Sequence, residues 1–186
     1  MTHHTNSQNV AQRHTDETTE SGRSAHAGGY LIRHADSEKL QDGPTSIIEL
    51  LADGEHTGGA LTVNRAQLEV SSPGAPSHRH RNTTETIFVI DGSLDVLLGD
   101  DVHVLARGDL IVVPPGVPHA FAPTAGESAD MLAVFTPGQR RIEYYRLLER
   151  LHRGEATVDD LTATSDLYDN YYVESTTWDS RHPRGW

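Results

Sequence analysis

The stretch HRHRNTTETIFVIDG at residues 78–92 decides the fold, together with GDLIVVPPGVPHAF at residues 108–121. His78 and His80 are two residues apart, a spacing that sends both side chains to one face of a β-strand, with Cα atoms about 6.5 Å apart. Glu85 opens the next strand after a polar turn, and His119 follows a sharp Pro-Gly turn. Because imidazole nitrogens and carboxylate oxygens are common ligands of transition metals, these four residues predict one divalent-metal site.

The predicted ligand set is mixed, with three nitrogens and one oxygen. Such a site suits iron, manganese or nickel, which we expect first, and also cobalt, copper or zinc. The ligands alone do not select among these ions. Arg79 and Arg81 alternate with the two histidines and are therefore expected on the opposite face of the strand.

Many short apolar runs separated by turn signals extend from Tyr30 to Thr136, and this pattern favours an all-β sandwich or barrel. Asp91-Gly92 predicts a tight hairpin turn. Further turns are expected at residues 99–101, 107–109 and 114–116, which gives an antiparallel meander of strands about five residues long. Residues 46–52 fit either a strand or a short helix, and residues 131–135 are expected to form the last core strand.

Both stretches resemble the two motifs of the cupin superfamily, small β-barrels in which three histidines and a glutamate bind one metal. The spacings from His78 to Gly92 and from Gly108 to His119 fit these motifs, as does the 15-residue spacer between them. Two positions depart from the pattern. The leading glycine of the first motif would fall at Ser72, with Gly74 nearby, and Pro123 replaces the usual asparagine that ends the second motif.

The resemblance implies an antiparallel, jelly-roll-like cupin β-barrel over residues 29–137. We expect a disordered tail over residues 1–28 and a helical, aromatic-rich segment over residues 138–186. Within the superfamily, residues 57–136 look most like the single-domain quercetin 2,3-dioxygenase group. That likeness implies a homodimeric, metal-dependent dioxygenase that acts on a small enol, phenol or flavonol-like substrate, with dioxygen as a possible second substrate.

Glu85 would then have two roles, as metal ligand and as general base for the substrate hydroxyl. Two other classes stay open. The ion could act only as a Lewis acid in an isomerase, cyclase or lyase, or the chain could be a non-catalytic module that binds a metal or a small ligand.

The C-terminal segment predicts an amphipathic helix, because Ile142, Tyr145, Leu148 and Leu151 share one helical face, and Gly154 is placed to end it. A second helix is expected to start at Thr157. The aromatic residues beyond it either pack against the barrel or a dimer partner, or form a lid that supplies Tyr168, Tyr171 or Trp178 to a substrate.

We expect the pocket itself to be lined mainly by aliphatic side chains. The candidates are Val63, Leu68, Ile87, Val89, Phe121 and Leu132, each of which is also a good core residue. His103, His152 and His182 lie outside any motif and are interpreted as ordinary histidines.

The composition limits the partners. A net charge of −12 argues against binding to nucleic acid or to an anionic membrane. The chain has no cysteine, which excludes a disulfide framework and a thiolate metal site. No apolar run approaches the roughly 20 residues of a membrane span, and the N-terminus lacks the apolar core of a signal peptide. We therefore expect a cytoplasmic protein that binds a small molecule.

Overall fold

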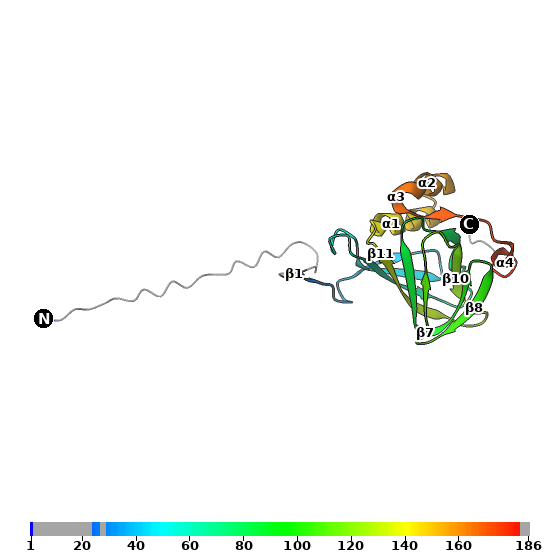
Figure 1. Cartoon of the computed structure of the whole chain (residues 1–186), viewed down its shortest axis with the longest axis horizontal. Helices are drawn as coiled ribbons and strands as arrows, with labels where there is room; N and C mark the ends of the chain where they lie inside the picture. The colour runs from blue at the N-terminus through cyan, green and yellow to red at the C-terminus, as the bar shows by residue number, and fades with distance from the viewer. Residues whose placement is uncertain (2–23, 27–28, 183–186) are drawn as a thin grey trace.

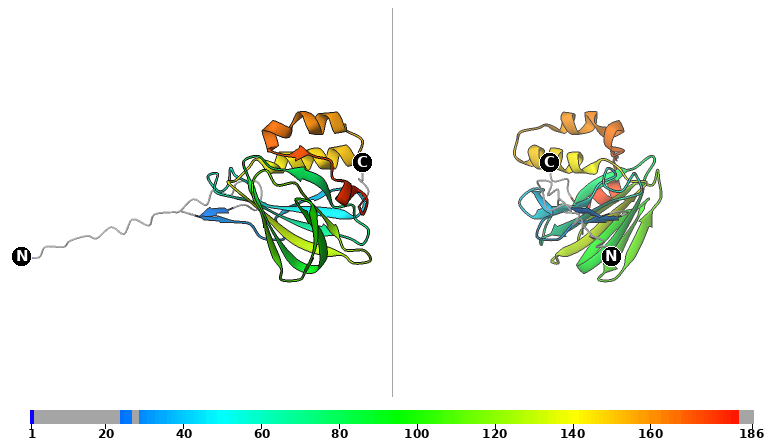
Figure 2. Two further views of the ribbon diagram at one scale, coloured as in Figure 1. Left: turned by 45° about the vertical axis from the view of Figure 1, so that its right-hand side comes forward. Right: turned by 90° about the vertical axis from the view of Figure 1, so that its left-hand side faces the viewer.

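A computed structural model describes Met1, residues 24–26 and residues 29–182 of the 186-residue chain. Its body is a ten-stranded antiparallel β-sheet curled into a half-barrel, and helices from the C-terminal part lie over one end (Figures 1 and 2). The all-β barrel with C-terminal helices predicted from the sequence is confirmed. The residues predicted to form the disordered tail lie outside the described part, except for Met1 and Ser24–His26.

The order of the strands in the sheet differs from their order along the chain. The strands are β1 (Ser24–His26), β2 (Gly29–Leu31), β3 (Glu38–Gln41), β4 (Ser46–Ala52), β5 (Thr62–Leu68), β6 (Ala75–Arg79), β7 (Thr84–Leu98), β8 (Asp101–Ala106), β9 (Leu110–Val113), β10 (His119–Pro123), β11 (Ala129–Thr136) and β12 (Tyr171–Tyr172). The helices are α1 (Arg141–His152), α2 (Val158–Ala163), α3 (Ser165–Tyr168) and α4 (Thr176–Asp179). The main sheet has the order β12-β6-β10-β7-β11-β5-β4-β3, while β8 and β9 also pair with β7, and β1 pairs with β2 separately.

Strand β7 corrects one prediction. The chain does not reverse at Asp91-Gly92, because β7 runs through this point as a single 15-residue strand. The register with β11 shifts between Asp91 and Val89, so the strand has a bulge there, and Gly92 beside the bulge has φ 77°. The half before the bulge pairs with β9 and the half after it with β8 and β10, which replaces the predicted simple meander.

The core follows from strand periodicity. Every second residue of β5 and β11 is buried, as expected when one face of each strand packs inward. The main cluster contains Ile87, Val89, Met131 and Phe135, each at most 1% exposed. Residues 46–52, which fitted either a strand or a helix, form β4.

Helix α1 closes one end of the half-barrel, and α2 and α3 stack over it (Figure 2). Its predicted apolar face packs on β3 and β4 through Ile142, Tyr145 and Leu148. Gly154 follows its C-cap with φ 71°, and Thr157 forms a capping box at the start of α2, as the sequence predicted. Among the described residues no helix has the length and apolar character needed to cross a membrane.

Candidate metal centre

The four predicted ligands come together inside the half-barrel. His78 lies in β6, and His80 directly follows that strand. Glu85 is the second residue of β7, and His119 is the first residue of β10. One potential ligand atom from each residue lies within 4.8 Å of those of the other three, and all four residues are buried. The pairing of β10 with β6 places His119 directly opposite His78, so strand register builds half of the cluster.

Backbone carbonyls set the orientation of each imidazole. The Nδ1 atoms of His78, His80 and His119 lie 2.8, 2.6 and 3.0 Å from the carbonyl oxygens of Pro76, Asp169 and Val117, respectively. A carbonyl oxygen only accepts hydrogen bonds, so each Nδ1 carries the proton and donates it. A neutral ring held in this way has its lone pair on Nε2, the arrangement by which hydrogen-bonded histidines bind metals.

The contacts between the ligands themselves favour a cation. The Nε2 atoms of His119 and His80 lie 2.8 and 3.1 Å from Oε2 of Glu85. With the Nδ1 protons committed to the carbonyls, these contacts bring lone pairs of neutral rings against a carboxylate oxygen. A positive charge between them would relieve this repulsion, so the donor set and its orientation fit a divalent transition metal.

Protonation of the buried groups agrees with this donor set. Burial holds the pKa of His78 well below its ordinary value, and burial also lowers the pKa of His80. Burial alone would raise the pKa of Glu85. Hydrogen bonds from the His119 and His80 rings lower it well below its ordinary value when these rings carry a proton on Nε2, and a cation bound in the same place would lower it when they do not. At neutral pH His78 and His80 are therefore neutral and Glu85 is a carboxylate, the forms that bind a metal.

Local backbone geometry supports both ligand motifs. Gly74 has φ 61°, and a Cβ there would lie 1.9 Å from the carbonyl oxygen of Phe121 on β10. This glycine, rather than residue 72, therefore allows the close approach of the two motifs, while Ser72 is buried and its hydroxyl bonds that of Ser46 at 2.6 Å. The Gly116 amide donates to the carbonyl of His80 at 2.6 Å, which ties the second motif to the first.

The C-terminal segment contributes a residue that the sequence did not reveal. Asp169, in the left-handed conformation at φ 52°, gives its carbonyl to His80. Its carboxylate accepts from the backbone amides of Arg81 and Asn82 at 2.8 and 3.0 Å, and from the Thr83 hydroxyl at 2.8 Å. One residue thus holds both the ring of a ligand and the turn between His80 and Glu85. A contact across nearly 90 residues has no local sequence signal.

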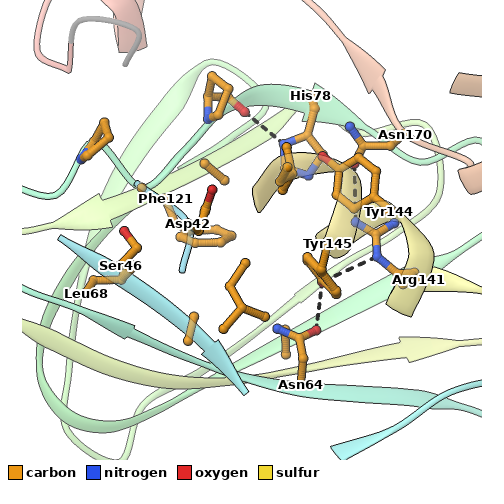
Figure 3. Close-up of a pocket in the computed structure, with 18 of the residues that line it drawn as sticks. Asp42, Ser46, Asn64, Leu68, His78, Phe121, Arg141, Tyr144, Tyr145 and Asn170 are labelled. Carbon is orange, nitrogen blue, oxygen red and sulfur yellow. Dashed lines mark hydrogen bonds between the residues drawn. The ribbon is translucent and has the colours of Figure 1, made fainter. Parts of the chain in front are cut away.

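His78 and Glu85 open onto a cavity between the sheet and α1 (Figure 3). The space in this cavity that no atom fills, including the part open to solvent, is about 940 Å³. The prediction of a mainly aliphatic lining is wrong, because Tyr144 and Tyr145 of α1 and Tyr172 of β12 form much of the wall. These residues reach the cavity through tertiary packing of the C-terminal segment, which strand patterns do not show.

The predicted lining residues divide into three groups. Leu68 and Phe121 line the cavity, Ile87 and Val89 belong to the sealed core, and Val63 and Leu132 alternate away from the buried face of their strands. Of the histidines interpreted as ordinary, His152 and His182 line the cavity, where each lies close to an aspartate. His103 is exposed on β8.

The aromatic tail packs against the barrel of its own chain. Trp178 is 1% exposed in a cluster with Leu97 and Ala120, and it also lines the cavity. Tyr168 and Tyr171, the other two residues proposed for a lid, do not line it; Arg81 stacks on the Tyr171 ring at 3.8 Å. The tail therefore packs on the barrel, the first of the two predicted roles, and Trp178 also lines the cavity; packing against a dimer partner and closure as a lid stay predictions.

Arg141 is a second residue that sequence reasoning missed. It lies in the first turn of α1, is 2% exposed and lines the cavity. A signal was present, because Arg141, Tyr145 and Leu148 recur at the spacing of one helical face.

Comparison with known proteins agrees with this geometry. Residues 64–135 match the family described as Cupin domain. Quercetin 2,3-dioxygenase of Bacillus subtilis (strain 168) is 31% identical over 93 residues, which are 50% of this chain and 27% of that protein. A putative germin-like protein 3-2 of Oryza sativa subsp. japonica is 29% identical over 136 residues, covering 68% of this chain and 54% of that protein. The chain thus spans about a quarter and about half of the lengths of these two relatives.

Solved structures share the fold. The crystal structure of an RmlC-like cupin from Shewanella frigidimarina NCIMB 400 superimposes with a TM-score of 0.54 at 19% identity, covering 65% of this chain and 98% of that one. At this identity the likeness establishes the fold and says nothing further about activity.

Proposed function

Because its residues 64–135 form a cupin domain with a buried cluster of three histidines and a glutamate, we propose that this chain is a metal-dependent dioxygenase. Its substrate would be a small enol, phenol or flavonol-like molecule. One observation carries the proposal: His78 and Glu85 of the cluster open directly onto a cavity with tyrosine and phenylalanine walls. The distant similarity to quercetin 2,3-dioxygenase supports it.

His78, His80, Glu85 and His119 would hold the ion, with iron, manganese or nickel expected first. When bound, such an ion supplies a Lewis acid for an enol or phenol oxygen and, if it is redox-active, a means to use dioxygen. Glu85 lines the cavity and is ionised, so it can accept the proton of a substrate hydroxyl that comes within hydrogen-bond reach. Its low pKa keeps it in the carboxylate form that binds a metal but makes it a weak base, so proton transfer depends on its position.

The tyrosines of the wall act as donors. Burial raises the pKa of Tyr144 well above its ordinary value and that of Tyr172 to about 12. Their hydroxyls lie 2.7 Å apart and stay protonated at neutral pH, so they can orient a polar substrate group but cannot remove a proton.

The test begins with metal analysis of protein purified without added metal, followed by oxygen-uptake measurements with flavonols, simple enols and catechols. Uptake that matches substrate loss, and that disappears in His119→Ala but not in His103→Ala, is expected. His103 is an exposed histidine on β8 and serves as the matched control.

Other outcomes would assign the chain to another class. Product formation without oxygen would overturn the dioxygenase and favour an isomerase, cyclase or lyase. Binding without turnover of any compound would favour a non-catalytic module.

A further inference from the structure

Arg141 places a positive charge inside the cavity, where the carboxylate of Glu85 acts on it only from beyond ion-pair distance. The guanidinium is fully charged at all relevant pH values, yet no ion pair joins it to any acidic residue in the described part of the chain. Its hydrogen bonds are long and go to neutral atoms, namely the Tyr145 hydroxyl at 3.5 Å, the Tyr168 carbonyl at 3.3 Å and Oδ1 of Asn170 at 3.3 Å. Burying a charge with such weak compensation is unfavourable unless something else offsets it.

Aromatic rings provide part of that compensation. The Cζ atom of Arg141 lies 4.2 Å from the centre of the Phe135 ring and 4.9 Å from that of Tyr144. These cation–π contacts hold the guanidinium in place, but they use the faces of the group and leave part of its N–H edge unused. A planar guanidinium fixed in this way is suited to bind a carboxylate through two parallel hydrogen bonds.

Asn170 is the second, independent observation. Its side chain is 2% exposed and lines the same cavity. Arg141 donates to Oδ1, which fixes the orientation of the side-chain amide and leaves Nδ2 as its donor end. Nδ2 is buried and has no hydrogen-bond partner of normal geometry among the described residues, although the Tyr172 hydroxyl lies close enough for the amide to influence its pKa. A buried N–H donor without a well-formed hydrogen bond is rare and points to a ligand that supplies a better acceptor.

The two donors lie beside the metal cluster. The Phe135 ring contacts Arg141 on one side and lies 5.6 Å from the His80 ring, centre to centre, on the other. Figure 3 shows Arg141, Asn170 and His78 on one side of the cavity, with Leu68 and Phe121 on the other. Arg141 and Asn170 line the same cavity as the proposed ligands His78 and Glu85, so a single small molecule can reach both groups.

We propose that the cavity binds a small carboxylic acid, with its carboxylate held by Arg141 and Asn170 and its apolar part against Leu68 and Phe121. This inference deepens the proposed function. It rests on that function only for one contact of the ligand, in which an enol or phenol oxygen is directed toward the metal cluster. The substrate class is then a hydroxylated aromatic acid or an enol acid. The chain as a whole carries a net charge of −12, so an affinity for anions has to come from the cavity.

The test measures binding and needs neither metal nor turnover. Benzoate and benzamide have the same shape and differ in charge, and their dissociation constants are measured by calorimetry on the full chain after removal of metal. We expect benzoate to bind about tenfold more tightly, a difference of about 1.4 kcal/mol. Equal affinities, or no binding of either compound, would overturn the inference. Tighter binding of phenylphosphonate than of benzoate would overturn the assignment to carboxylates.

Variants assign the preference to residues. Arg141→Gln is expected to abolish the difference between benzoate and benzamide, while Arg146→Gln keeps it, since Arg146 lies on the solvent side of the same helix and pairs with Glu38 and Glu143. Asn170→Ala, which leaves the guanidinium in place, is expected to weaken benzoate several-fold and serves if Arg141→Gln does not fold. A preference that survives in Arg141→Gln, or an unchanged affinity for benzoate in Asn170→Ala, contradicts the inference.

Failure here and failure of the proposed function are distinguishable. Oxygen uptake without carboxylate binding would remove only this inference. Carboxylate binding without oxygen uptake would remove only the dioxygenase.

Discussion

Replacing Asp169 tests how far the C-terminal segment builds the metal site. In Asp169→Ala the carboxylate disappears, and the amides of Arg81 and Asn82 and the Thr83 hydroxyl lose their acceptor. A hydrogen bond to a charged group contributes about 1.5–3 kcal/mol. Because the three share one carboxylate and two belong to residues that are otherwise exposed, we expect a loss of about 3–4 kcal/mol in the free energy of unfolding, in keeping with the larger effects of single substitutions.

The left-handed conformation adds to this cost for alanine. Asp169 has φ 52°, which asparagine tolerates better than alanine. Asp169→Asn also keeps one acceptor oxygen, so its loss is expected to be about half as large. The order of stability is therefore wild type, then asparagine, then alanine. Asp166→Ala is the matched control, because its side chain is 88% exposed and its ion pair with Arg81 is expected to contribute under about 1 kcal/mol.

The same substitution is expected to weaken metal binding. The backbone carbonyl of residue 169 orients the His80 ring, and the carboxylate holds this carbonyl in place through its bonds to the turn at residues 81–83. Without the carboxylate the carbonyl is expected to shift, and loss of such a supporting contact typically costs about 10- to 100-fold in metal affinity. Stability is measured by denaturant titration of metal-free protein, so that metal binding does not alter the comparison. Affinity is measured separately by competition with a chelator. An alanine variant within 1 kcal/mol of wild type, with unchanged metal affinity, would refute this account of the segment.

Three further predictions concern pH, a glycine and assembly. The hydrogen bond to Asp42 raises the pKa of His152, so the pair stabilises the fold below the ordinary pKa of histidine, and this contribution is lost as pH rises through the pKa of the folded state. The difference in unfolding free energy between wild type and His152→Gln is expected to be about 0.5–1 kcal/mol at pH 5.5 and to shrink by pH 8.5. A difference that stays constant with pH would contradict this prediction. Gly74→Ala should destabilise the fold by more than about 2 kcal/mol, because the added Cβ would overlap the Phe121 carbonyl oxygen. Gly99 also has a positive φ, but a Cβ there would meet no neighbour within 4 Å, so Gly99→Ala should cost less in the same denaturant titration. Equal losses of stability in the two variants would rule out the clash. Light scattering should give twice the 20.4 kDa chain mass if the expected homodimer forms, and the mass of one chain would exclude it.

The ligands could be predicted from the sequence because their placement is local. A two-residue repeat fixes the faces of His78 and His80, and glycine and proline turns place Glu85 and His119 on neighbouring strands. The fold followed from the same turn signals. The error at Asp91-Gly92 has the same origin, since a glycine with positive φ serves a bulge as well as a hairpin, and only the pairing of β7 with four other strands decides between them.

The surroundings of the site could not be predicted in this way. Asp169, Asn170 and Tyr172 reach the barrel because a C-terminal segment without periodicity adds β12 to the edge of the sheet beside β6. That pairing depends on tertiary packing that one sequence does not reveal. Arg141 could have been predicted, because its position in the helix places it on the same face as the buried Tyr145 and Leu148. It was missed because a charged residue is usually assumed to face solvent.

Metal content is the most direct test of the central claim. Elemental analysis of protein purified without added metal is expected to give about one divalent transition ion per chain, and Glu85→Ala and His119→Ala, if folded, are expected to retain far less. A folded wild-type chain that takes up no transition metal even after incubation with iron, manganese and nickel salts would contradict the claim.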